Sequence, residues 1–123
     1  MAYSFDRRRL ASVTPLQWIA ALLAVVSALV HLALGIQFVP ATLGILFVLA
    51  GVGFFIGIAA ALVTTRRDVV AALGIPYTGI QIVLWYVIQQ PTLGTLSPPE
   101  IIDKVAQIVL IVLLVVIVRR ERV

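Results

Sequence analysis

Four long apolar segments, each close to the length needed to cross a lipid bilayer, constrain this chain more than any other feature. They cover residues 16–36, 39–63, 69–88 and 101–118. A helix needs about 20 apolar residues to cross a hydrocarbon layer of about 30 Å. A strand of a membrane barrel alternates polar and apolar residues, and none of these segments does. We therefore predict an all-α fold, an integral membrane four-helix bundle that forms one domain over residues 1–123, with helices over approximately 15–36, 40–64, 68–89 and 98–119.

Composition agrees with lipid as the solvent of these segments. Of the 123 residues, 63% are hydrophobic and 11% are charged, whereas a soluble domain has roughly 45–50% apolar and about 25% charged residues. The absence of cysteine excludes thiolate metal sites, iron–sulfur clusters and disulfide exchange. Because the chain also has a single histidine and only Met1 as a thioether, we expect no metal site and no cofactor.

The positive charges predict the orientation of the bundle. Eight of the nine Lys and Arg residues are Arg7, Arg8, Arg9, Arg66, Arg67, Arg119, Arg120 and Arg122. With four crossings they all fall on one side, and the opposite loops at 37–40 and 89–100 contain no Lys or Arg. Positive residues in short loops stay cytoplasmic, so we expect both termini inside a cell membrane (N-in/C-in). Arginines at helix ends suit the lipid bilayer as a partner and argue against nucleic acid.

Small residues recur at helical spacing in the first two predicted helices. One face of the first helix has the stripe Ala20, Ala24, Ser27, His31 and Gly35. In the second helix, Gly53, Gly57 and Ala61 are four residues apart and form a candidate packing seam. Small residues let membrane helices approach closely. The seam suits packing within the bundle or, alternatively, an interface with a second copy or another membrane protein.

Other residues mark helix starts and a candidate kink. Thr14 precedes Pro15 as an N-cap residue, and Asp68 is the expected cap of the third helix. Pro76 lies inside the third helix, where it frees the carbonyl of Ala72 and favours a kink. We expect Thr78 or a neighbouring helix to satisfy that carbonyl.

The strongly polar residues inside the spans gather toward the side opposite the arginines. The candidate polar pocket consists of His31, Gln81, Trp85, Asp103 and Gln107. Glu100, Asp103 and Gln107 share one face of the fourth helix, at i, i+3 and i+7. Because Asp103 and Lys104 lie in the first turns of that helix, we expect them at the level of the headgroups, where charge costs little.

Three interpretations of this cluster stay open. In the first, His31 is a packing residue hydrogen-bonded to Gln81, Gln107 or a backbone carbonyl, and Asp103 pairs with Lys104 or water. In the second, the pocket binds a small solute, a quinone headgroup or a pigment, with Trp85 and Tyr86 as its walls. In the third, His31 and Asp103 relay protons, since an ionisable residue in a membrane is a functional candidate.

Three segments also point to a family. These are TPLQWIAALLAVVSALVHLALG at 14–35, GIPYTGIQIVLWYV at 74–87 and DKVAQIVLIVLLVVIVRR at 103–120. Together the segments resemble a group of small four-helix membrane proteins of halophilic archaea that has only a domain-of-unknown-function label. The resemblance implies the cell membrane of such an organism, and it brings no activity and no catalytic residue.

The expected function follows from these features. We expect a non-enzymatic membrane protein, an accessory or structural subunit that packs through its small-residue seams. The alternative is a minimal oligomeric transporter or channel with an outward-facing polar pocket around His31.

Overall fold

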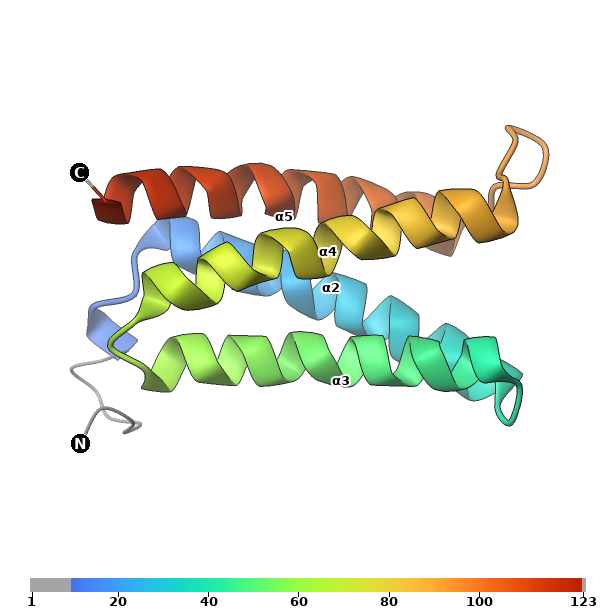
Figure 1. Ribbon diagram of the computed structural model, residues 1–123, viewed down its shortest axis with the longest axis horizontal. Coiled ribbons are helices and arrows are strands. Elements are labelled where there is room, and N and C mark those ends of the chain that lie inside the picture. Colours follow the sequence, from blue (N-terminus) through green and yellow to red (C-terminus); the bar gives the residue numbers. More distant parts are fainter. Residues whose placement is uncertain (1–9, 123) are drawn as a thin grey trace.

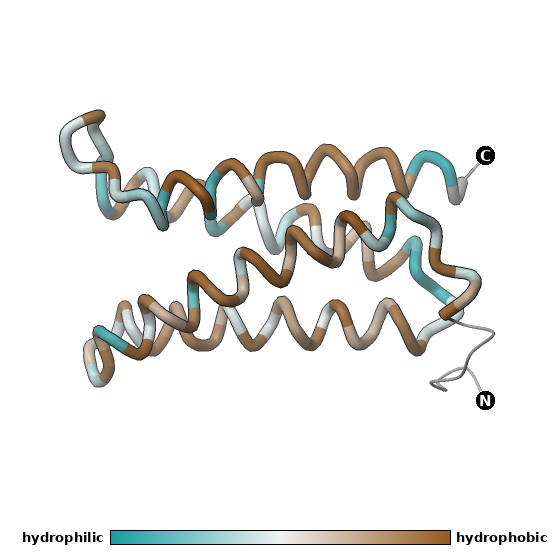
Figure 2. Tube along the Cα trace, turned by 180° about the vertical axis from the view of Figure 1, so that it is seen from behind, coloured by the Kyte–Doolittle hydropathy of each residue, from teal (hydrophilic) through white to brown (hydrophobic). Residues whose placement is uncertain are grey.

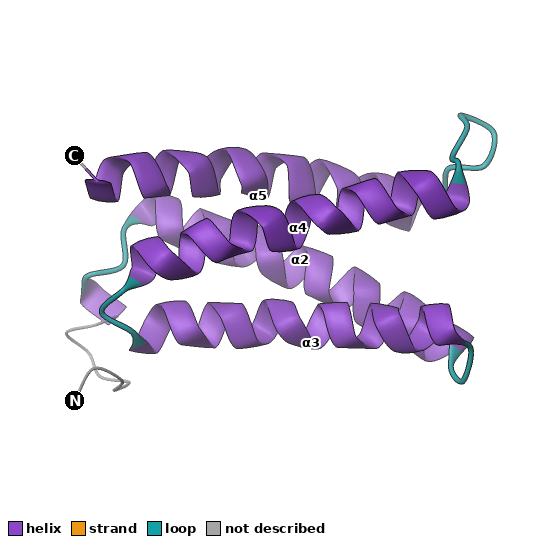
Figure 3. Ribbon diagram, viewed as in Figure 1, coloured by secondary structure: helices purple, strands orange, loops and turns teal. Residues whose placement is uncertain are grey.

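Four long α-helices make up almost all of the described chain. The computed structural model describes the backbone of residues 10–122 and the side chains of residues 10–120, so Arg7, Arg8 and Arg9 lie outside the described residues. The helices are α2 (Pro15–Phe38), α3 (Thr42–Val63), α4 (Arg67–Gln89) and α5 (Pro98–Arg122) (Figure 1). The described part of the chain contains no strand (Figure 3). Each helix begins and ends within a few residues of the range expected from the sequence.

Each of the four helices is long and apolar enough to cross a membrane. Hydrophobic residues dominate along all of them (Figure 2). The start of α2, the connection at 64–66 and the end of α5 lie at one end of the bundle, which we call the terminal end. The connections at 39–41 and 90–97 lie at the other end, the loop end. All the described arginines are thus at the terminal end.

Side chains cap the starts of α2 and α5, and the cap of α2 is Thr14, as expected from the sequence. The Thr14 side chain accepts a hydrogen bond from the backbone N–H of Gln17, and the Gln17 side chain accepts one from the N–H of Thr14. At α5 the N–H of Glu100 donates to the Ser97 hydroxyl at 3.4 Å. The expectation for Asp68 is wrong, because the cap position of α4 is Arg66 and Asp68 lies in the first turn.

Close packing between α2 and α3 depends on glycines. The predicted stripe on α2 is buried, as expected: Ala20, Ala24, Ser27, His31 and Gly35. A Cβ atom at Gly35 would lie 2.8 Å from the backbone N of Val48, and one at Gly44 would lie 2.9 Å from the carbonyl oxygen of Gly35. Glycine at both positions therefore lets the two backbones touch, as small residues do in membrane bundles.

The bundle consists of two hairpins, α2–α3 and α4–α5, which are joined through α2. This helix starts beside α5 and ends beside α3, so it crosses the bundle diagonally (Figure 1). Helices α3 and α4 are the least closely packed neighbouring pair. Toward the loop end α3 and α4 diverge, and the two hairpins separate there. This separation leaves space between the two hairpins at the loop end.

We predict that Gly44→Ala destabilises the protein by about 1–3 kcal/mol, the usual cost of forcing an extra carbon into a packed contact. The neighbours of the added carbon are backbone atoms of Phe38, Val39 and Gly35, which cannot rotate away. Gly79→Ala is the control, because its Cβ meets nothing within 4 Å and alanine favours a helix by up to about 1 kcal/mol. The stability of both variants is measured by unfolding in mixed detergent micelles. If Gly44→Ala and Gly79→Ala were equally stable, the close contact at Gly44 would be contradicted.

Candidate functional site

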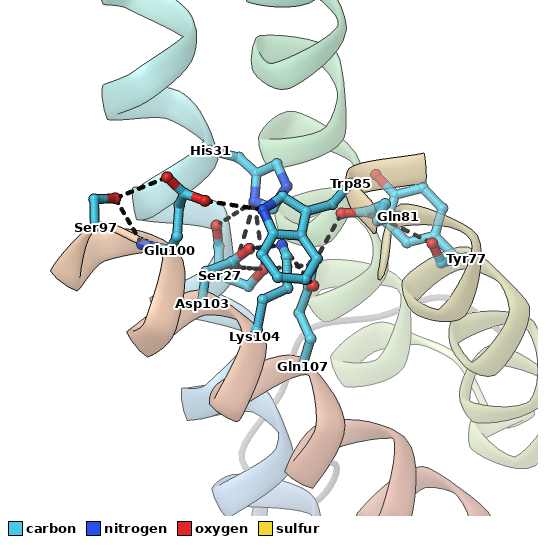
Figure 4. Close-up of polar contacts among 10 residues, drawn as sticks. All are labelled: Ser27, His31, Tyr77, Gln81, Trp85, Ser97, Glu100, Asp103, Lys104 and Gln107. Carbon is cyan, nitrogen blue, oxygen red and sulfur yellow. Dashed lines mark hydrogen bonds and ion pairs between the residues drawn. The ribbon is translucent and has the colours of Figure 1, made fainter. Parts of the chain in front are cut away.

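Three helices contribute side chains to a polar network in the loop-end half of the bundle. Ser27 and His31 come from α2, Gln81 comes from α4, and Asp103, Lys104 and Gln107 come from α5 (Figure 4). Ser27, His31, Asp103 and Gln107 are all buried. The structure thus brings together residues that are up to 80 positions apart in the chain.

Ser27 lies at the centre of this network. Its hydroxyl donates to Oδ1 of Asp103 at 2.6 Å and accepts from Nε2 of Gln107 at 3.2 Å. The same Gln107 nitrogen also donates to Oε1 of Gln81 at 3.2 Å. One amide group therefore ties α5 to both α2 and α4, and both of its protons have acceptors.

Lys104 neutralises the buried carboxylate of Asp103. Its ammonium group forms an ion pair with Oδ2 of Asp103 and donates to Oε1 of Gln107 at 3.1 Å. The same ammonium lies 5.2 Å from the centre of the Trp85 ring, within the range of a cation–π contact. Asp103 is only 3% exposed, so its side chain lies between helices. Because Asp103 lies in the first turns of α5, the sequence indicated its position along the helix. The sequence did not indicate the direction in which its carboxylate points.

His31 contacts the network through one ring nitrogen. Nδ1 lies 2.8 Å from the carbonyl oxygen of Ser27 and 3.6 Å from Oδ1 of Asp103. Because a carbonyl oxygen only accepts hydrogen bonds, Nδ1 bears a proton. In the neutral ring, Nε2 is then a hydrogen-bond acceptor. Phe47 packs edge-on against the ring and Phe54 lies tilted beside it, with centroids 5.5 and 6.1 Å away.

Serine, histidine and aspartate meet here without forming a hydrolytic triad. In a triad the histidine bridges the serine and the carboxylate through its two different nitrogens. Here Ser27 donates directly to Asp103, and His31 faces both through Nδ1 alone. The Ser27 side chain is completely buried and its hydroxyl already donates and accepts. The hydrogen bonds of Ser27 thus differ from those of a serine activated by histidine.

A second polar group lies where α4 meets the start of α5. Glu100 accepts hydrogen bonds from the Trp85 ring N–H at 3.1 Å and from the Ser97 hydroxyl at 3.0 Å. Among the described residues no Lys, Arg or His forms an ion pair with Glu100. Its carboxylate is therefore held in place without a compensating positive charge.

A pocket of about 440 Å³ opens between the two hairpins at the loop end, and we call it the loop-end pocket. Its polar lining consists of His31, Gln81, Trp85, Gln89, Ser97, Glu100, Asp103 and Lys104. Its apolar lining consists of Val30, Leu34, Phe38, Leu43, Leu46, Phe47, Ala50, Leu84 and Ile88. Four of the five pocket residues proposed from sequence line it, and Gln107 lies behind them, bonded to Gln81.

The remaining sequence candidates lie elsewhere in the bundle. Gly53, Gly57 and Ala61 line a second cavity, in the terminal half. Gly53 also allows a close contact with Tyr77 of α4, as expected for packing within the bundle. A Cβ at Gly53 would overlap the Tyr77 hydroxyl, whereas one at Gly57 would meet nothing within 4 Å. Helix α4 continues through Pro76, which is exposed.

The expectation that Thr78 satisfies a freed carbonyl is wrong. Its Oγ1 is buried and has no hydrogen-bond partner among the described residues. Within the same part of the chain, no group of three or more His, Asp or Glu side chains is placed to hold a metal ion.

Sequence reasoning missed the role of Ser27, whereas the expected pairing of Asp103 with Lys104 is confirmed. Ser27 was identified only as a small residue of the α2 stripe, although it lies one helical turn before His31 on the same face. Its spacing from His31 was the available signal. The partner of Ser27 on α5 depends on how α2 crosses the bundle, and the helix patterns do not encode that crossing.

Comparison with known proteins adds one match. A family model described as a family of unknown function (DUF7475) matches residues 6–118. No curated protein and no solved structure matches the chain.

We predict that Asp103→Asn destabilises the protein by about 3–5 kcal/mol, because it leaves the Lys104 ammonium without its counter-ion in a buried position. The double variant Asp103→Asn, Lys104→Met should recover most of this loss, since both charges are then gone. Asp68→Asn, which removes a partly exposed carboxylate paired with Arg66, is the matched control and should change stability by less than about 0.5 kcal/mol. If Asp103→Asn and Asp68→Asn changed the stability of the protein equally, the structural importance of the network would be contradicted.

Proposed function

The chain belongs to DUF7475, a family of unknown function, and from its structure we propose a multi-pass membrane protein that binds a small organic cation in the loop-end pocket. The observation that carries the proposal is the Glu100 carboxylate, which lines the pocket and has no ion-pair partner among the described residues. The sequence alone did not predict the charge of a ligand that would bind in this pocket.

The four apolar helices support insertion in a membrane with the terminal end in the cytoplasm. Arg66, Arg67, Arg119 and Arg120 are at the terminal end, and the loops at the other end contain no Lys or Arg. Short loops rich in Lys and Arg remain cytoplasmic. In this orientation the loop-end pocket opens toward the outer face of the cell membrane, in a halophilic archaeon if the sequence resemblance extends to the source.

The charges of the pocket favour a positive ligand. Asp103 and Lys104 form an ion pair and cancel each other, which leaves the negative charge of Glu100. In the neutral ring, with the proton on Nδ1, His31 adds an acceptor at Nε2. The pocket therefore offers a ligand one negative charge and one neutral acceptor. A cation in partly apolar surroundings gains more from such a carboxylate than it would in water.

The walls of the pocket favour an organic cation over a hydrated metal ion. Phe38 and Phe47 line one side and Trp85 the other, and half of the remaining lining residues are aliphatic. Aromatic faces attract cations, and apolar walls bury the carbon substituents of an alkylammonium. The volume of about 440 Å³ falls within the range of roughly 300–1,000 Å³ for small-molecule sites.

Binding also fits the structure better than the accessory-subunit role expected from the sequence. That role would use Gly53, Gly57 and Ala61 as a surface for a partner helix. In the structure all three line a cavity formed with residues of the other helices. Of the interpretations of the polar cluster, the solute-binding one has the feature it requires, a pocket, and we propose no enzymatic reaction.

Benzyltrimethylammonium is a suitable probe, with neopentylbenzene as its neutral isostere. In detergent micelles or nanodiscs, calorimetry should show Glu100→Gln binding the cation about tenfold more weakly, as expected when about 1.4 kcal/mol of charge interaction is lost. Binding of the neutral isostere should not change. Glutamine keeps one acceptor oxygen for the Trp85 ring N–H, and its NH2 group can donate to the Ser97 hydroxyl, so the local structure is retained.

Asp68→Asn provides the control for this experiment, because it removes one carboxylate at the terminal end and leaves the pocket unaltered. It should bind the cation as the unsubstituted protein does. The proposal fails if the unsubstituted protein prefers the neutral isostere, or if Glu100→Gln and Asp68→Asn have the same affinity for the cation.

A further inference from the structure

A second cavity, separate from the loop-end pocket, lies in the terminal half of the bundle. Its volume is about 130 Å³, and all four helices contribute to its lining. From α3 it has Gly53, Phe54 and Gly57, and from α4 it has Gly74 and Thr78. No residue lines both this cavity and the loop-end pocket. The network around Ser27 and Gln107 lies between the two.

Small residues keep this cavity open. A Cβ at Gly57 would meet nothing within 4 Å, so contact with a neighbouring helix does not require glycine at this position. Glycines in a packed membrane bundle usually permit close contact, as Gly35 and Gly44 do between α2 and α3. Gly57 differs, because it borders unfilled space.

Thr78 supplies a second, independent feature of the cavity. Its side chain is 1% exposed and lines the cavity, and Oγ1 has no hydrogen-bond partner among the described residues. Burying a hydroxyl without a partner destabilises a protein. A bound water would need two to four polar partners, and the lining is almost entirely apolar. An orphaned hydroxyl in an apolar cavity is suited to a ligand that is apolar except for one polar atom.

We propose that this cavity binds a single-ring aromatic molecule with one hydrogen-bonding oxygen, and that Thr78 recognises that oxygen. An apolar protein cavity of about 150 Å³ is known to hold benzene, so the size here fits one ring. Phe54, Tyr77 and Trp18 line the cavity and can contact the ring. The hydroxyl of Tyr77 is already used, because it donates to the carbonyl of Ala50 at 2.7 Å. Gln17 and Arg67 also line the cavity, but Thr78 is the lining residue with a buried hydroxyl that has no partner among the described residues. Thr78 therefore offers the ligand oxygen an unused hydrogen-bonding group.

Fluorescence of Trp18 can report binding directly. The chain has two tryptophans, so Trp85→Phe leaves Trp18, which lines the cavity, as the remaining one. The probes are 4-bromophenol and 4-bromotoluene, which differ by a hydroxyl and a methyl group; the bromine atom quenches a tryptophan that it contacts. In this background we expect saturable quenching by 4-bromophenol.

Thr78→Val should weaken binding of 4-bromophenol roughly fivefold, as the loss of one neutral hydrogen bond implies, and should not weaken binding of 4-bromotoluene. Gly57→Leu should abolish saturable quenching by both probes, because the leucine fills the cavity. Gly79→Leu and Thr42→Val are matched controls outside the cavity and should bind as the background protein does. Equal affinity of Thr78→Val and Thr42→Val for 4-bromophenol would overturn the proposal, as would quenching that is not saturable in the background protein.

Stability without ligand gives a readout that does not depend on the probes. Valine has the shape of threonine without the hydroxyl, so Thr78→Val should raise the thermal midpoint of the ligand-free protein. A lower midpoint would show that the hydroxyl is already bonded within the protein, and that result would also overturn the proposal. The binding site for the organic cation shares no lining residue with this cavity, so each proposal can fail alone.

Discussion

Everything in this structure depends on the need of buried polar groups for partners inside the protein. Lipid offers no hydrogen bonds, so a carboxylate or amide between membrane helices has to be satisfied by other side chains. Ser27, Asp103, Lys104 and Gln107 meet this requirement as a set, because each donates to or accepts from another member. Removing one member leaves another unpaired. The network thereby specifies how α5 is rotated against α2 and, through Gln81, against α4.

The same network explains why a pocket can exist beside it. Glycine contacts hold α2 against α3, the network joins α2 to α5, and α3 is left free to diverge from α4 toward the loop end. The loop-end pocket occupies the resulting space, with His31, Asp103 and Lys104 among its lining residues. Because Lys104 neutralises Asp103, Glu100 contributes the remaining negative charge of the pocket lining. Helix packing and the charge of the pocket therefore follow from one arrangement of side chains.

Periodicity and helix chemistry made part of this architecture predictable. The apolar lengths predicted four helices, and the α2 stripe from Ala20 to Gly35 faces the bundle as its spacing indicated. Thr14 was recognisable as a cap because the side-chain chemistry of a helix start is local. All five residues of the predicted polar pocket lie together in the structure. Their depth along each helix could be calculated, since the rise per residue is constant.

Contacts between helices were less predictable. Gly53, Gly57 and Ala61 have the spacing of a packing seam, but the close α2–α3 contact uses Gly35 and Gly44. A spacing pattern identifies a helix face and does not say which neighbour faces it. The burial of Asp103 was missed for a related reason, because it depends on the rotation of α5, which Ser27 and Gln107 determine together.

The most direct test of the whole account is the side of the membrane on which each end of the bundle lies. The chain has no cysteine, so Leu93→Cys, at a 95% exposed position in the loop end, and Thr65→Cys, at an exposed position in the terminal end, each introduce a single reactive thiol. Intact cells are treated with a membrane-impermeant maleimide, before and after permeabilisation. We expect Leu93→Cys to react in intact cells and Thr65→Cys to react only after permeabilisation. Labelling of Thr65→Cys in intact cells would contradict the account, because the pocket would then open toward the cytoplasm or the chain would not cross the membrane as described.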